Sequence, residues 1–91
     1  MTTIVDWQKV DGESVPRSLQ EALGKLSTAE GDVLLDFSAV RRIDPSGLRA
    51  IEDFAAEADR KSVKVALRGV NVDVYKVLKL ARLTERFSFV N

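Results

Sequence analysis

Apolar residues recur three or four positions apart in three stretches of the chain, the spacing of one face of a helix. Pro16 lies in the first turn of the first stretch, Pro45 opens the second, and Asn71 precedes the third, all suitable residues for a helix start. The apolar faces comprise Leu19, Ala22, Leu23 and Leu26; Leu48, Ile51, Ala55 and Ala58, with Phe54 at the border; and Val74, Val77, Leu78 and Ala81. The pattern predicts three amphipathic helices.

Short runs that are β-prone or uniformly apolar lie between these stretches. They cover residues 3–7, 33–37, 63–67 and 87–90, and residues 27–31 have the composition of a loop. We therefore expect four strands. The chain's single tryptophan, Trp7, lies on the first strand, where we expect it to be partly buried against a helix. If an earlier strand is missing, Trp7 instead covers a sheet edge or a partner surface.

The predicted order, β-α-β-α-β-α-β, is typical of an α/β fold built from right-handed βαβ units. We expect a mostly parallel or mixed sheet of about four strands, covered by three to four helices. A chain of 91 residues has room for one modest core. Residues 1–91 are therefore predicted to form a single domain.

The composition narrows the classes of function. Lys plus Arg and Asp plus Glu number 14 each, so the net charge gives no overall attraction to nucleic acid. The chain has no cysteine or histidine, which removes disulfides and the commonest general base and metal ligand. No apolar run approaches the roughly 20 residues that span a bilayer, and the first nine residues do not resemble a signal peptide. We expect a cytoplasmic protein that is not inserted in a membrane, with no cofactor, metal or catalytic residue.

Residues 33–48 resemble the signature of the STAS domain family. In that family, a hydrophobic strand ends in Asp-hydrophobic-Ser, here Asp36 to Ser38, and an Asp-Ser-Ser-Gly-Leu or Asp-Ser-Thr-Gly-Leu turn then leads into a helix. The corresponding turn here begins at Asp44 and ends at Leu48. The strand, loop and helix of residues 63–83 agree with the family in order and spacing, so the resemblance extends from about Gly31 to Leu83. The N-terminal third is less similar, because the family usually has two strands before its first helix.

The resemblance implies a bacterial, non-enzymatic protein-binding module similar to the anti-sigma factor antagonists. In those proteins the residue after the aspartate is a serine, which is phosphorylated by the partner kinase, the anti-sigma factor itself. Phosphate adds roughly −2 charge and breaks the complex. Here that position is Pro45, which has no hydroxyl. Ser46 has one, but it lies roughly 100° further round the helix, and a local bond in the first turn is its more ordinary role.

The resemblance also implies where partners bind. The expected docking surface comprises Asp44, Pro45, Ser46, Gly47, Arg49 and Arg42. The first expected partner is a serine kinase-like anti-sigma factor. Residues 67–80 are also similar to the STAS subunits of bacterial phospholipid-transport ABC complexes, which makes an ABC ATPase subunit the second. A homodimer is left open. A small hydrolase or nucleotide-binding enzyme is a third hypothesis, against which the missing histidine, cysteine and glycine-rich loop argue.

Overall fold

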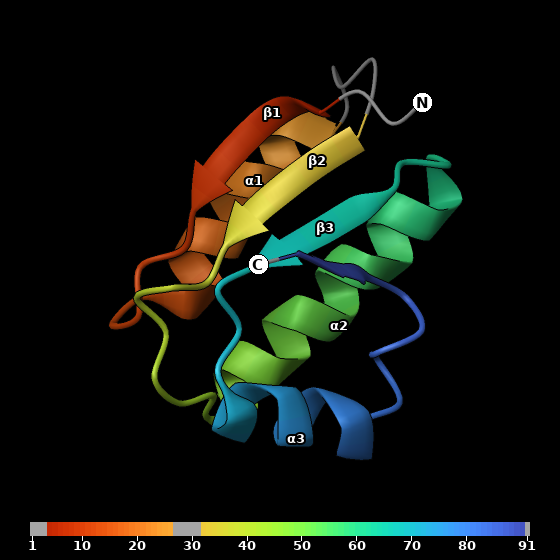
Figure 1. The fold of residues 1–91 in the computed structure, drawn as a ribbon. Helices are drawn as coiled ribbons and strands as arrows, with labels where there is room; N and C mark the ends of the chain where they lie inside the picture. The colour runs from red at the N-terminus through yellow and green to blue at the C-terminus, as the bar shows by residue number, and fades with distance from the viewer. Residues whose placement is uncertain (1–3, 27–31, 91) are drawn as a thin grey trace.

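The computed structural model describes residues 4–26 and 32–90, in which strands and helices alternate along the chain (Figure 1). Thr3 and the predicted loop at 27–31 lie outside the described residues. The elements are β1 (Ile4–Lys9), α1 (Val15–Leu26), β2 (Asp32–Asp36), α2 (Pro45–Arg60), β3 (Val65–Arg68), α3 (Val72–Leu80) and β4 (Ser88–Val90). The predicted α/β order is confirmed. None of these helices is long and apolar enough to cross a membrane.

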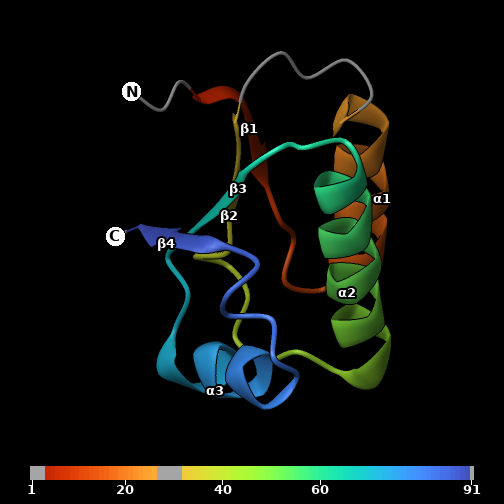
Figure 2. The same ribbon diagram turned by 90° about the vertical axis from the view of Figure 1, so that its right-hand side faces the viewer.

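The four strands form one parallel sheet in the order β1-β2-β3-β4. Because β1, β2 and β3 are neighbours in the sheet and consecutive in sequence, crossovers of the same hand carry α1 and α2 to the same side. Figure 2 shows α1 and α2 together on one face of the sheet and α3 lying across the end at which the strands finish. The opposite face of the sheet is covered by no helix of the described chain. The carboxyl ends of β1, β2 and β3 thus meet at one edge.

The core fills the space between the sheet and its helices. Val33, Leu35 and Phe37 point toward the helices, because side chains alternate along a strand, and all three belong to the main buried cluster. The apolar faces predicted for α1 and α2 are confirmed, with three differences in degree. Phe54 is fully buried rather than at the border, whereas Leu23 and Leu48 are only partly buried against the core.

Trp7 does not pack against a helix, so that prediction is wrong. Its neighbour Gln8 faces α1 and accepts a hydrogen bond from Lys25 Nζ at 2.8 Å, so the alternation of β1 turns Trp7 to the uncovered face. Trp7 pairs with Leu34 in the register of β1 and β2, and 52% of its surface is exposed. The alternative, in which Trp7 lies at a sheet edge, agrees with its place on the outer strand β1.

Candidate docking surface at the start of α2

The β2–α2 loop, residues 37–44, is clamped between the loops that follow β1 and β3. A Cβ atom at Gly12 would lie 2.2 Å from the carbonyl oxygen of Ala39, which no side chain tolerates. On the other side, Gly69 has a φ of 72° and lies so close to Ser38 that an added Cβ would be 2.9 Å from the serine Cβ. Glycine at both positions lets the three loops approach backbone to backbone. The clamp fixes the place at which α2 begins.

Hydrogen bonds join the same loops. The Asn71 side chain accepts from the N–H of Val74 at 2.8 Å and so caps α3. Its amide group also donates to the carbonyl oxygens of Val40 and Arg41, both at 3.2 Å, and thereby connects α3 to the β2–α2 loop. One side chain therefore holds a helix start and a loop that are about 30 residues apart in sequence.

Asp36, which ends β2 in the family signature, has a structural role. Its carboxylate accepts a hydrogen bond from the N–H of Ser38 at 2.9 Å. This bond lowers the pKa of Asp36, and the nearby cations Arg68 and Lys9 lower it further. Register places these cations beside Asp36 on the neighbouring strands. The Asp-hydrophobic-Ser part of the signature thus ends the strand and turns the chain toward α2.

The start of α2 is a compact capped turn. Asp44 is the N-cap, and its Oδ1 accepts from the N–H of Gly47 at 2.7 Å and from the hydroxyl of Ser46 at 2.9 Å. The Gly47 bond, followed by the Ser46 bond, lowers the pKa of Asp44. Pro45 occupies the first helical position, where its missing N–H costs nothing. A Cβ at Gly47 would lie 3.1 Å from Oδ1 of Asp44, which is closer than an ordinary contact, so glycine leaves room for the capping carboxylate.

The structure brings most of the predicted site residues to one exposed surface. Asp44, Pro45, Ser46, Arg42 and Arg49 are exposed, and Gly47 is buried beneath them. Arg49 follows Pro45 by one helical turn, and therefore lies on the same side of α2. Arg42 and Asp44 line one cleft of about 260 Å³. We call the exposed five the α2-start surface.

The loop after β1 also borders this surface, and the sequence reasoning missed it. Asp11, Gly12 and Glu13 line a hollow of about 510 Å³ together with Arg41 and Arg42. Two acidic and two basic residues from different loops thus line the same hollow. The signal that would have found them is the parallel sheet itself, because the loops after adjacent parallel strands emerge at the same edge.

The sequence profile of the STAS domain matches residues 8–91, which is nearly the whole chain. The chain belongs to the STAS domain family. The expected resemblance is thereby confirmed, and it now includes the part of the N-terminal third that begins at Gln8. No curated protein matches this STAS domain by sequence.

Several solved structures share the fold. One is a candidate anti-sigma factor antagonist from Thermotoga maritima, with a TM-score of 0.75 and 20% identity over 100% of this chain and 85% of that one. A serine-to-glutamate variant of RsbS from Moorella thermoacetica has a TM-score of 0.77 and 17% identity over 99% of this chain and 82% of that one. A sulfate transporter family protein from Wolinella succinogenes has a TM-score of 0.77 and 20% identity over 98% of this chain and 80% of that one. At these identities the likeness concerns the fold.

Proposed function

We propose that this STAS domain is a regulatory module that binds a protein partner through the α2-start surface and catalyses no reaction. The observation that carries the proposal is the exposure of Asp44, Pro45 and Ser46 on a helix start that three loops hold in place. A surface that is already fixed loses little conformational freedom on binding. Residues 1–91 would act as one domain in the cytoplasm, where both candidate partners described below work.

The proposed module lacks the usual phosphorylation switch. Pro45 stands where the family resemblance expects the phosphorylated serine, and proline offers no acceptor oxygen. The hydroxyl of Ser46 is already bonded to the Asp44 carboxylate. A phosphate there would place roughly −2 charge beside that carboxylate, so repulsion opposes the modification. The domain would therefore behave as a permanently unphosphorylated form, controlled by its amount or by the state of its partner.

A serine kinase-like anti-sigma factor is the first candidate partner, in keeping with the anti-sigma factor antagonist among the structural neighbours. Its kinase activity provides the test. The protein and a Pro45→Ser variant are incubated with the cognate kinase and ATP, and intact mass and phosphosites are measured. We expect no phosphate on the wild-type protein and one phosphate on the variant, at the substituted position. Stoichiometric phosphate at Ser46 of the wild type would contradict the missing switch.

An ABC ATPase subunit is the second candidate partner. The similarity of residues 67–80 to STAS subunits of phospholipid-transport complexes favours it, and this segment includes the exposed Tyr75 and Leu80. Capture of the tagged protein from its source cells, followed by mass spectrometry, separates the two candidates. Recovery of an ATPase and a permease would identify the ABC ATPase as the partner. Recovery of a sigma-factor regulator would instead identify the anti-sigma factor and exclude the ABC ATPase.

A further inference from the structure

The side of α3 that points away from the core carries apolar residues in solvent. Val74 and Leu78 hold the helix against the core and are fully buried. On the opposite side, Val72 is 68% exposed and Leu80 is 86% exposed. The outward face of α3 comprises its exposed residues, which are Val72, Asp73, Tyr75, Lys76, Lys79 and Leu80. Exposed apolar side chains that gather on one face indicate an interaction site more often than single ones do.

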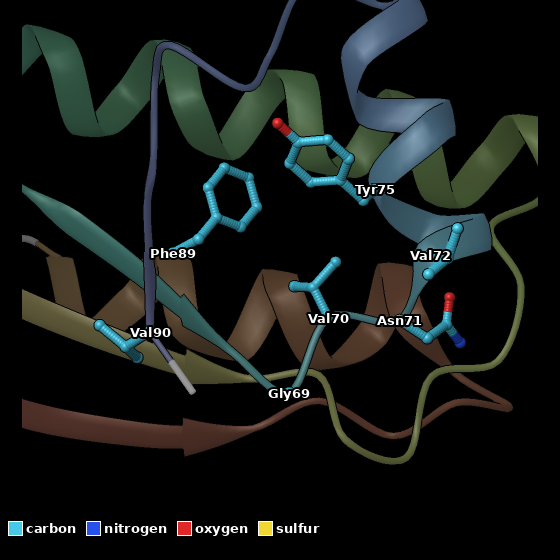
Figure 3. Close-up of a pocket in the computed structure, with 7 residues that line it drawn as sticks. All are labelled: Gly69, Val70, Asn71, Val72, Tyr75, Phe89 and Val90. Carbon is cyan, nitrogen blue, oxygen red and sulfur yellow. The ribbon is translucent and has the colours of Figure 1, made fainter.

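A cleft opens beside this face, between the start of α3 and β4. It has a volume of about 300 Å³ and is lined by Gly69, Val70, Asn71, Val72, Tyr75, Phe89 and Val90. Tyr75 and Phe89 meet edge to face with ring centroids 5.3 Å apart, and Figure 3 shows Val70 close below both rings. The side-chain oxygen of Asn71 is already bonded to α3. The cleft thus presents a mainly apolar, aromatic wall that suits an apolar side chain.

Positive charge surrounds the other end of α3. Lys76, Lys79 and Arg82 line a second hollow of about 460 Å³ together with Leu80. None of the three cations takes part in an ion pair within residues 4–26 and 32–90. The only acidic residue in α3 is Asp73, in its first turn. The outward face and Arg82 therefore combine apolar side chains with three cations and the single carboxylate of Asp73.

We propose that the outward face of α3 and the cleft beside β4 bind an acidic amphipathic helix of a protein partner. One apolar side chain of that helix enters the cleft between Tyr75 and Val72, and its carboxylates face Lys76, Lys79 and Arg82. Opposite charges across an interface speed association and select partners. A concave cleft favours a protein segment over a lipid surface, which needs no such recess.

This surface goes beyond the α2-start surface of the proposed function and shares no residue with it, although it overlaps the segment 67–80 whose similarity favours an ABC ATPase partner. The proposals for the two surfaces can therefore be tested separately. Binding at α3 would let the domain hold a second protein while the first occupies the start of α2.

The test uses random peptides displayed on phage and selected on the whole protein. We expect enriched sequences to place Asp or Glu three or four positions from a large apolar residue. Synthetic copies of those peptides should bind the wild type, and the pair of changes Lys76→Glu and Lys79→Glu should weaken binding by about tenfold. Leu80→Ser should weaken it severalfold. Lys64→Glu removes an exposed lysine elsewhere and serves as the matched control.

Three results would overturn the proposal. One is enrichment of peptides without acidic residues, or no enrichment at all. Another is equal affinity of the selected peptides for the wild type and the Lys76→Glu, Lys79→Glu variant. The third is binding to vesicles of phosphatidylcholine and phosphatidylglycerol that these two changes abolish, which would assign the face to a membrane. Arg49→Glu should leave peptide binding unchanged, so a failure at α3 is separate from a failure at the start of α2.

Discussion

The start of α2 and the outward face of α3 are both exposed helical surfaces, but they are built in opposite ways. At the start of α2, Asp44 and Ser46 bond to each other, and the exposed side chains are polar or proline. On α3, Val72 and Leu80 stand in solvent while nearby cations lack partners among the described residues. The first surface is rigid and polar, and the second is apolar and basic. Such surfaces suit different partners, so one small domain can serve two contacts.

The origin of the difference lies in how each helix is held. The start of α2 depends on its loops, since Gly12 and Gly69 allow contacts that larger residues would break. In contrast, α3 is held by the burial of Val74 and Leu78 on one side and by the Asn71 cap. The outer residues of α3 therefore contribute little to stability and are free to bind.

The largest difference in stability is expected between substitutions on the buried and the exposed face of α3. Leu78→Ala removes a fully buried side chain and should lower the free energy of unfolding by about 3 kcal/mol. Leu80→Ala, two positions away on the exposed face, should change it by less than about 0.5 kcal/mol. Chemical denaturation followed by circular dichroism measures both. If the two variants were equally destabilised, Leu80 would be part of the core and the proposed second surface would be lost.

The next largest change in stability is expected where Gly12 contacts the β2–α2 loop. Gly12→Ala places a Cβ against the Ala39 carbonyl oxygen and should cost about 2 kcal/mol, because backbone must move on both sides. Gly24→Ala is the matched control. Gly24 lies inside α1 with nothing within 4 Å of an added Cβ, so alanine there should stabilise by about 0.5–1 kcal/mol. A Gly12→Ala protein as stable as the wild type would show that the loops are not tightly clamped.

The smallest expected effect is a loss of folding stability at acidic pH. Hydrogen bonds lower the pKa values of Asp36 and Asp44 below the ordinary value of 3.8, first from the Ser38 and Gly47 N–H groups respectively. The unfolded chain then takes up protons at a higher pH than the folded chain does. The stability that these carboxylates contribute is complete above 3.8 and is lost as the pH falls through the folded pKa values.

Urea denaturation at a series of pH values measures this loss. The wild-type free energy of unfolding should be level near neutral pH and should fall below about pH 4. The double variant Asp36→Asn, Asp44→Asn removes both titrating groups, so its decline should be shallower. An identical decline in the two proteins would place the acid sensitivity in other groups.

Much of this architecture could be predicted from the sequence, because helices and buried strands depend on local periodicity. The order of elements and the helix starts at Pro45 and Asn71 were predicted. The orientation of Trp7 was not, since alternation along a strand does not say which face of a sheet lacks a covering layer. The contact of Gly12 with Ala39 also escaped prediction, because it joins loops that come together only in the folded sheet.

The candidate site divides in the same way. The family signature located Asp44, Pro45 and Ser46, and local chemistry explains their cap and their exposure. The position of the acidic loop beside the arginines follows from the order of the strands, which periodicity alone does not give. The role of Pro45 depends on the family resemblance and stays a prediction until phosphorylation is measured.

The most direct test of the proposed function is the affinity of the partner recovered from source cells for two charge-reversed variants. Isothermal titration calorimetry would compare the wild type, Arg49→Glu on the α2-start surface and Lys79→Glu on α3, each first shown to be folded by circular dichroism. We predict that Arg49→Glu weakens binding of the α2-start partner by about tenfold, whereas Lys79→Glu leaves its affinity unchanged. An affinity that is unchanged in Arg49→Glu, and in variants of Asp44, Pro45 and Ser46 as well, would contradict the proposal that partners dock at the start of α2.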